Sequence, residues 1–362
     1  MIRWRRVPLH RWSLLVNLLL VVATAVLAAL LVTRPDPQVP RVSANAPGAR
    51  ALDRAGPALS GSVPGTMASM ADVAWFIPKL DEARGDMPPA YQYGCEQNQD
   101  DPDAVRCDFA DTASDFRVAM VGDSKILQWQ SAIASLGRDN SWHVISYTKS
   151  NCGLHAGLQL NHGKPYRNCE EWNSQVMDRL LADPPDVVLV SNHVNTALAD
   201  TGQGGDGQTA DGDEPDSATE EQQSTEAMTE GLTQQWSKLE QAGSDVIVIL
   251  DNPSPIGSVY ECLQGHLEDL GACAFPRSEG IARSAQSVQL DAAEEVGTVD
   301  VVDLTESICP APMCVPVIGN VLIYRQGSHL TDTYVRTLTE ALGRQLVPLV
   351  AQRSNYPDTQ TG

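Results

Sequence analysis

Apolar residues along this chain follow two different spacings. Short runs that are apolar throughout fit single buried strands, and the stretches between them repeat apolar residues every three or four positions, as in helices. The expected strands are Val118 to Val121, His143 to Tyr147, Val187 to Ser191, Val246 to Leu250 and Val299 to Val302. The expected helices are Ile126 to Leu136, Glu170 to Ala182, Thr219 to Ala242 and Ser278 to Val296. The alternation predicts an α/β fold with a parallel sheet covered on both faces, but not its strand order.

The first strand stops at a turn that carries a serine. Gly122, Asp123 and Ser124 follow the apolar run, and helical spacing resumes at Ile126. A strand, tight turn and helix would lift the Ser124 hydroxyl clear of the sheet edge, with the N–H groups of the helix start beside it. Gly-Asp-Ser consists of ordinary turn residues, so its meaning depends on whether a base can reach the serine.

A histidine stands in a comparable place near the end of the chain. The apolar run Val321 to Tyr324 leads into a turn with His329, and a helix should begin near Thr331. If both turns lie at the carboxyl edge of one parallel sheet, Ser124 and His329 can meet. The nucleophile would then come early in the chain and the base last.

The amino end carries an apolar segment long enough to cross a bilayer. Residues 12–33 form an apolar segment in which Asn17 is the only strongly polar member, and basic residues precede it with no comparable cluster after it. We expect a retained transmembrane anchor with a cytoplasmic amino end and an exported remainder. A cleavable signal peptide is the alternative, although its apolar core would be about half as long.

The rest of the chain divides by composition. Residues 34–66 are rich in Pro, Ala, Gly and Ser and are expected to form a flexible stalk. The following residues suffice for one large domain. The expected divisions are a basic tail at 1–11, the anchor at 12–33, the stalk at 34–66, an extracytoplasmic domain at 67–352 and a tail at 353–362.

Acidic residues are in excess, and the formal net charge is -21. Between Asp200 and Glu230 there are acidic side chains but no Lys or Arg. We expect a solvated insert at 199–218, with an interaction with a partner or cation as the alternative. Because the exported part lacks a basic stripe with interleaved aromatic residues, nucleic acid is not expected as a partner.

The eight cysteines agree with export, since disulfides persist outside the cytoplasm. Sequence alone does not fix their pairing. We expect neighbours to pair because short loops close at low entropic cost. The expected pairs are Cys95–Cys107, Cys152–Cys169, Cys262–Cys273 and Cys309–Cys314. A metal site is the alternative, but no Cys-x-x-Cys or His-Glu-x-x-His occurs, so neither a metal nor another cofactor is expected.

Several segments in order, over about residues 90–350, resemble the SGNH (GDSL-like) hydrolase superfamily. More narrowly, the chain resembles the extracytoplasmic SGNH domains attached to membrane O-acyltransferases of bacterial surface glycans. The matching segments are Val121 to Lys125 with Gln128 and Trp129, Tyr147 to Cys152, Asp186 to Val190, Val246 to Pro253, Cys262 with Cys273, and Tyr324 with Arg325 leading to His329, Leu330 and Thr331. The resemblance implies a three-layer, flavodoxin-like α/β sandwich.

The resemblance also implies roles for individual residues. Ser124 would attack an acyl group and His329 would take its proton, with His193 as a less favoured base. The oxyanion donors would be the N–H groups of Ser124 and Gly153 and the side-chain amide of Asn192. Gly153 could instead be only a turn residue, and Asn192 could cap the next helix.

Three neighbours of Ser124 have simpler expected roles. Asp123 should brace its own turn by accepting backbone N–H groups. Lys125 stands where relatives often carry His, and a solvated lysine is expected rather than a catalytic one. Trp129 should pack in the core, with the lining of an acyl pocket as the alternative.

The chain departs from the family at Gln326, since relatives carry Asp three residues before the histidine. A neutral amide can orient the imidazole but cannot compensate its charge. Three interpretations remain: a Ser-His dyad aided by Gln326 or a backbone carbonyl, a carboxylate supplied by Asp303 or Asp332, or an inactive descendant.

Two classes of function follow. The first is a membrane-anchored O-acyl esterase or O-acyltransferase, with acetyl as the expected group and a cell-envelope carbohydrate as substrate. If the chain transfers an acyl group, a separate membrane acyltransferase should supply it, because one span is too few to move that group. The second class is a glycan-binding module that has lost catalysis.

Overall fold

The computed structural model describes residues 45–53, 62–193, 196–198 and 217–352, all within a compact unit that begins at Val42. The expected anchor at 12–33, most of the acidic insert at 199–218 and the tail at 353–362 lie outside the described residues. None of the described helices has the length and apolar character needed to cross a membrane.

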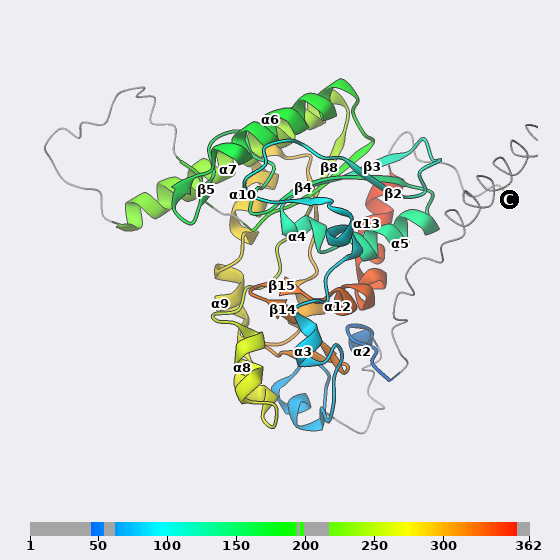
Figure 1. The fold of residues 1–362 in the computed structure, drawn as a ribbon, viewed down its shortest axis with the longest axis vertical. Coiled ribbons are helices and arrows are strands. Elements are labelled where there is room, and N and C mark those ends of the chain that lie inside the picture. The colour runs from blue at the N-terminus through cyan, green and yellow to red at the C-terminus, as the bar shows by residue number, and fades with distance from the viewer. Residues whose placement is uncertain (1–44, 54–61, 194–195, 199–216, 353–362) are drawn as a thin grey trace, which may run out of the picture. The chain divides into compact units, whose positions relative to one another are not determined.

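A seven-stranded sheet forms the centre of the unit (Figure 1). Its order is β1-β4-β3-β7-β8-β10, and these strands run parallel, whereas β2 pairs antiparallel with β4. Its strands are β1 Glu96–Gln97, β2 Cys107–Ala110, β3 Arg117–Gly122, β4 His143–Lys149, β7 Val187–Ser191, β8 Asp245–Ile249 and β10 Asp300–Val302. All five expected strands are present and parallel, so the predicted α/β fold with a central parallel sheet is confirmed.

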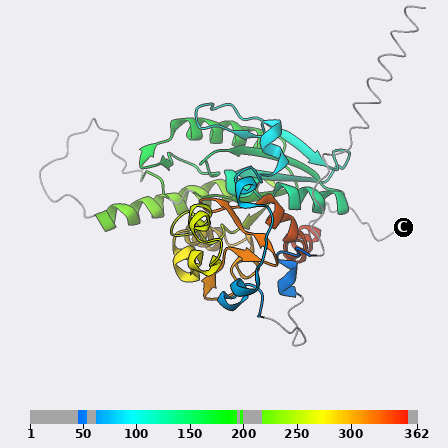
Figure 2. The ribbon, with the colours of Figure 1, turned by 60° about the horizontal axis from the view of Figure 1, so that its bottom comes forward.

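Helices cover both faces of this sheet, as Figure 2 also shows. Alternate residues of β3 point to opposite sides. Val118 and Met120 belong to the core with α5 Gln130–Asp139 and α13 Thr339–Ala351. Ala119 and Val121 belong to the core with α6 Arg167–Ala182, α7 Ser217–Ala242 and α10 Gln286–Val296. The apolar runs in β3, β7 and β8 are explained in this way, because both faces of these strands are buried.

Two expected helices are each divided. Residues 126–136 fall into α4 Ser124–Leu127 and α5, and residues 278–296 into α9 Arg277–Ala282 and α10. At the first division the Trp129 N–H donates to the Ile126 carbonyl, three residues back, so the chain tightens locally. The remaining helices are α2 Arg50–Asp53, α3 Leu80–Ala83, α8 Val259–Gly265, α11 Thr305–Ile308 and α12 Asp332–Thr337, with 3₁₀ helices η1 Met67–Asp72, η2 Pro89–Tyr93 and η3 Leu270–Cys273.

The segment before His329 does not join the central parallel sheet, so a shared sheet edge is not what brings His329 to Ser124. It forms β13 Val321–Leu322 and β14 Tyr324–Gln326, which pair antiparallel with β12 Val317–Ile318 and β15 His329–Leu330. Gly327 and Ser328 form the two-residue loop between β14 and β15, which favours pairing with the nearest strand. The other short strands are β5 Leu160–Asn161, β6 Lys164–Pro165, β9 Phe275–Pro276 and β11 Met313–Cys314.

Residues 45–53, inside the expected stalk, are packed against the domain. Ala46 and Ala49 are buried, and the Ala49 N–H donates to Thr337 Oγ1 at 2.9 Å. The small side chains that suggested a stalk also allow close approach to α12, which is why composition alone was ambiguous here.

Four disulfides join the neighbours expected from the sequence: Cys95–Cys107, Cys152–Cys169, Cys262–Cys273 and Cys309–Cys314. The expected pairing is confirmed. His266 lies beside Cys262 and Cys273, but both sulfur atoms are engaged in their mutual disulfide and are not thiolate ligands.

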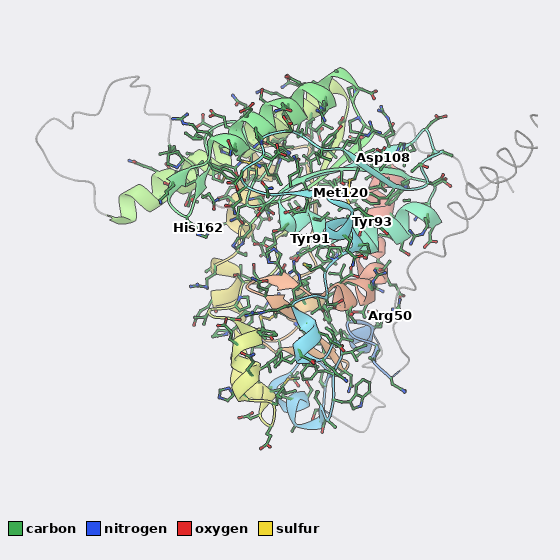
Figure 3. The ribbon with its side chains drawn as sticks, viewed as in Figure 1. Arg50, Tyr91, Tyr93, Asp108, Met120 and His162 are labelled. Atoms are coloured by element: carbon green, nitrogen blue, oxygen red, sulfur yellow. A yellow bond between two sulfur atoms is a disulfide. The ribbon has the colours of Figure 1, made fainter. Side chains whose placement is uncertain are left out.

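Two of the side chains labelled in Figure 3 differ in burial. Met120 on β3 is fully buried, whereas Tyr93, at the end of η2, is 66% exposed. The apolar side chains of β3 are enclosed, which gives the carboxyl end of this strand a rigid base.

Candidate active site

Ser124 is the first residue of α4, directly after the β3 turn. Asp123 braces this turn because its carboxylate accepts the N–H of Lys125 at 2.8 Å and that of His193 at 2.7 Å. Gly122 has φ +144°, and a Cβ there would overlap the carbonyl oxygen of Ser191 on β7. The expected strand, turn and helix are therefore present, and Asp123 accepts backbone N–H groups as expected.

His329 meets Ser124, although its hairpin lies outside the central sheet. His329 Nε2 is 2.7 Å from Ser124 Oγ, and His329 Nδ1 is 3.3 Å from the Gln326 carbonyl oxygen. A carbonyl only accepts hydrogen bonds, so Nδ1 must carry the proton. In the neutral imidazole Nε2 is then free to accept the Ser124 proton, which is the arrangement a general base needs.

The Gln326 contact is made by its backbone, since its side chain is exposed. The two alternative carboxylates are engaged elsewhere. Asp303 accepts the Thr305 N–H at 2.7 Å, and Asp332 accepts Arg336 Nε at 2.7 Å. Of the three interpretations left open by the sequence, this geometry matches the dyad oriented by a backbone carbonyl.

The surroundings of His329 disfavour its protonated form. Burial, followed by the charges of Lys125, Arg325 and His193, lowers the pKa of His329 to about 3. The contact with the Gln326 carbonyl opposes this shift only in part. The imidazole is therefore neutral at pH 7 and can receive a proton, but among these neighbours the Gln326 carbonyl alone stabilises the resulting cation.

Lys125 is completely buried, so the expectation of a solvated lysine is wrong. Its Nζ lies 2.9 Å from Asp251 Oδ1, and both side chains are inaccessible to solvent. Burial would raise the pKa of Asp251, but Lys125 and His193 lower it to about 2. Trp129 is also fully buried within the apolar core, as expected.

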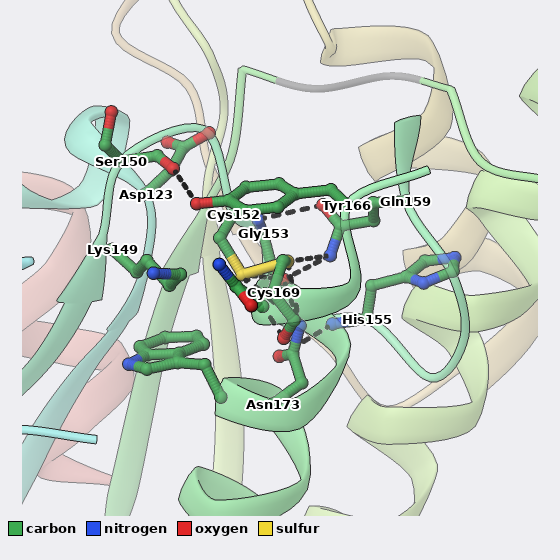
Figure 4. Close-up of a disulfide and its surroundings, with 12 residues drawn as sticks. Asp123, Lys149, Ser150, Cys152, Gly153, His155, Gln159, Tyr166, Cys169 and Asn173 are labelled. Atoms are coloured by element: carbon green, nitrogen blue, oxygen red, sulfur yellow. Dashed lines mark hydrogen bonds between the residues drawn. A yellow bond between two sulfur atoms is a disulfide. The ribbon is translucent and has the colours of Figure 1, made fainter. Parts of the chain in front are cut away.

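Two of the expected oxyanion donors lie side by side. A Cβ added to Gly153 would fall 2.9 Å from Asn192 Cβ, so these segments are in close contact. Gln289 Nε2 donates to Asn192 Oδ1 at 3.1 Å, which fixes the orientation of that amide. The Gly153 N–H already donates to Gln159 Oε1 at 3.0 Å (Figure 4), so serving an oxyanion would require this bond to open.

Glu96 on β1 is a buried acid near Asp123 that the sequence did not single out. Burial and the charge of Asp123 raise the pKa of Glu96 to about 8. Thr148 and the charges of Arg325 and Lys149 oppose this shift only in part. Its two-residue strand carries no periodic signal, so no sequence pattern could have identified it.

Three solved structures resemble the fold. The periplasmic domain of a lipopolysaccharide acetyltransferase from Salmonella Paratyphi A is 14% identical, with TM-score 0.49, covering 75% of this chain and 98% of that one. A GDSL-like lipase from Bacteroides thetaiotaomicron is 13% identical, with TM-score 0.32, and the match covers 65% of this chain and 88% of the lipase. A mutant acetyl-xylooligosaccharide esterase from Geobacillus is 12% identical, with TM-score 0.36, and the match covers 64% of this chain and 94% of the esterase. No curated protein matches the sequence.

A family model provides the stronger assignment. The model described as SGNH domain (fused to AT3 domains) matches residues 94–344. This range contains the Ser124 turn, the Gly153 and Asn192 segments and the His329 hairpin. The chain therefore belongs to the family of SGNH domains that are fused to AT3 domains.

Proposed function

We propose that this chain is a membrane-anchored, extracytoplasmic serine O-acyl esterase or O-acyltransferase that acts on a cell-envelope glycan, with acetyl as the acyl group. The observation that carries the proposal is the 2.7 Å contact between Ser124 Oγ and His329 Nε2, with the Gln326 carbonyl at His329 Nδ1. Family membership supports acyl chemistry, and the four disulfides support an oxidising compartment.

In the proposed reaction, His329 Nε2 takes the Ser124 proton as Oγ attacks the acyl carbonyl carbon. The oxyanion is met by the Ser124 N–H, the Asn192 amide and, after release from Gln159, the Gly153 N–H. The imidazolium then gives its proton to the departing alcohol. Water or a sugar hydroxyl next attacks the acyl-Ser124 ester and gives its proton to His329, which passes it to Ser124 Oγ as the acyl–oxygen bond breaks. Hydrolysis and transfer therefore share one intermediate.

The proposed anchor is residues 12–33, with the amino end in the cytoplasm. The family model describes SGNH domains fused to AT3 domains, which supports a membrane source of acyl groups for transfer. We propose that a separate membrane acyltransferase delivers the group when the acceptor is a sugar hydroxyl. No cofactor is needed for either reaction.

The test uses the full chain in detergent with its disulfides formed, offered p-nitrophenyl acetate and an acetylated glycan. Ser124→Ala and His329→Ala should each lower kcat/KM by at least about a hundredfold. His193→Ala is the matched histidine control and should retain His329-dependent turnover. Equal slow hydrolysis by the wild type, Ser124→Ala and His329→Ala would contradict the proposal.

A glycan-binding module is the second candidate. Two observations favour this function: no carboxylate is among the contacts of His329 described above, and the pKa of His329 is low. The imidazolium formed during acylation is therefore not compensated by a negative charge. Binding of an acetylated glycan with no Ser124-dependent turnover would support it, whereas turnover by the wild type alone would exclude it.

A further inference from the structure

The peptide groups on both sides of His329 are held by buried side chains from other elements. The Ser328 carbonyl oxygen accepts hydrogen bonds from Lys125 Nζ at 3.0 Å and from Asn252 Nδ2 at 2.9 Å. The Leu330 N–H donates to Gln128 Oε1 at 3.2 Å. Lys125 and Gln128 belong to the segment that begins at Ser124, and Asn252 follows β8.

These three side chains also bind one another, and we call them the His329 clamp. Asn252 Oδ1 accepts from Lys125 Nζ at 3.1 Å and from Gln128 Nε2 at 3.0 Å. None of the three residues is more than 2% exposed. A buried polar network in which each member is bonded is rigid, because an alternative arrangement would leave polar groups unpaired. The clamp therefore ties the β14–β15 hairpin to the helix that carries the nucleophile.

The positive charge of Lys125 in the clamp is balanced by Asp251. Asp251 pairs with Lys125 at 2.9 Å, and its other oxygen accepts the Ala285 N–H at 3.1 Å. A buried ammonium is tolerated when it is paired and hydrogen-bonded, which Asp251, Asn252 and Ser328 provide. Asp251 thus allows a lysine to serve as a tether in an interior where an unpaired cation would be unstable.

We propose that Lys125, Gln128 and Asn252 are positioning residues for His329: they hold its hairpin in place and so set the distance between His329 Nε2 and Ser124 Oγ. This inference rests on the proposed function, in which Ser124 attacks and His329 is the base. The contact of His329 Nδ1 is made within its own hairpin, at Gln326, so that contact cannot set the distance to Ser124. The clamp sets it, and a misplacement of about 1 Å between reacting groups costs about a hundredfold in rate.

The clamp positions His329 but does not compensate the charge of its imidazolium form. Lys125, Arg325 and His193 are the cationic or titratable groups that lower the pKa of His329, and Lys125 is the only one of them in the clamp. Positioning and charge can therefore be separated by choosing which clamp residue is changed.

Gln128→Met is the sharpest variant, because it removes the hydrogen bonds to Leu330 and Asn252, keeps the chain length and changes no charge. In the full chain with p-nitrophenyl acetate, we expect kcat and kcat/KM to fall about tenfold or more with KM little changed. The acid limb of the pH profile should not move, and hydrogen exchange of the Leu330 amide should become faster. The paired variant Lys125→Met with Asp251→Asn should also lose turnover, but its acid limb should move to higher pH.

Lys149→Met is the matched control. Lys149 is also fully buried and donates to backbone carbonyls, those of Asn98 and Asp101, but it does not contact Ser124 or His329. It should lower stability while kcat per folded molecule is retained. Wild-type kcat in Gln128→Met would overturn the clamp alone, whether or not Leu330 exchange becomes faster. A wild type without Ser124-dependent turnover would overturn the proposed function as well.

Discussion

Ser124 and His329 lie within hydrogen-bonding distance, but the molecule holds them in different ways. Ser124 follows a strand that pairs with β4 on one side and β7 on the other, and its turn is fixed by Gly122 and Asp123. His329 lies in a two-stranded hairpin that forms a sheet of its own. The nucleophile is therefore placed by backbone pairing, and the base by side chains that tie its hairpin to the nucleophile's helix.

This difference implies that the two regions should respond differently to mutation. Changes to the backbone at Ser124 should damage the fold, because the central sheet depends on the same residues. Changes around His329 should damage catalysis first, because a small hairpin can shift while the sheet remains intact.

The largest expected effect is a difference in stability between the alanine variants of two glycines with positive φ. Gly122→Ala should cost about 3 kcal/mol or more, because its Cβ overlaps the Ser191 carbonyl at φ +144°. Gly327→Ala in the hairpin should cost about 1 kcal/mol, since φ is +52° and a Cβ there has no heavy atom of the structure within 4 Å. Urea unfolding of both variants measures the difference, and equal losses would contradict the comparison.

Glu96 offers a pH-dependent change in stability beside the nucleophile. Its pKa is raised from 4.5 to about 8, so the folded state binds a proton more tightly than the unfolded chain. The stabilisation that this tighter proton binding gives the folded state is complete below pH 4.5 and is lost as the pH rises to 8. Glu96→Gln should therefore gain about 1–3 kcal/mol relative to wild type at pH 8.5 and nothing at pH 4.

The matched control for this measurement is Glu261→Gln, whose side chain is 65% exposed. It should show no comparable pH dependence in thermal or urea unfolding. A Glu96→Gln variant with the same stability difference at both pH values would mean that the Glu96 carboxyl is not desolvated as described.

His329 should titrate at a pH far below the pKa of an ordinary histidine. Because the pKa of His329 is lowered to about 3, the active neutral form persists as the pH falls. The kcat/KM for p-nitrophenyl acetate should change less than about twofold between pH 7 and pH 5. An acid limb with an apparent pKa between 6 and 7 would contradict the proposed environment of His329.

The smallest effect is expected at the position that departs from the family. Gln326→Ala should change kcat/KM less than about threefold, because the backbone carbonyl makes the contact to His329. Gln326→Asp should raise kcat/KM, up to about tenfold, if the new carboxylate stabilises the imidazolium. A hundredfold loss in Gln326→Ala would show that the side chain, and not the backbone, orients the base.

Local patterns in the sequence predicted the nucleophile region well. The apolar run before Gly122, the turn residues and the renewed helical spacing are all neighbours in the chain, so they specify the β3 turn and the place of Ser124. The five parallel strands followed from the same kind of pattern. The cysteine pairs were predictable because each closes a short loop.

The base region could be predicted only in part. His329 is predictable from its order and context, and Gly327 and Ser328 are typical of a two-residue hairpin loop, but neither signal says where that hairpin packs. The burial of Lys125 depends on Asp251, Asn252 and Ser328, which are far away in sequence, so no local pattern indicates it. Composition was also ambiguous at 45–53, where small residues serve packing as readily as flexibility.

The most direct test of the central claim is to trap the acyl-enzyme. The full chain is mixed with p-nitrophenyl acetate, quenched in acid and digested, and the peptides are examined by mass spectrometry. We predict one acetyl group on Ser124 in the wild type, none at that peptide in Ser124→Ala, and a strongly reduced amount in His329→Ala. Acetyl groups elsewhere with none on Ser124, or equal labelling of Ser124 in the wild type and His329→Ala, would contradict the account.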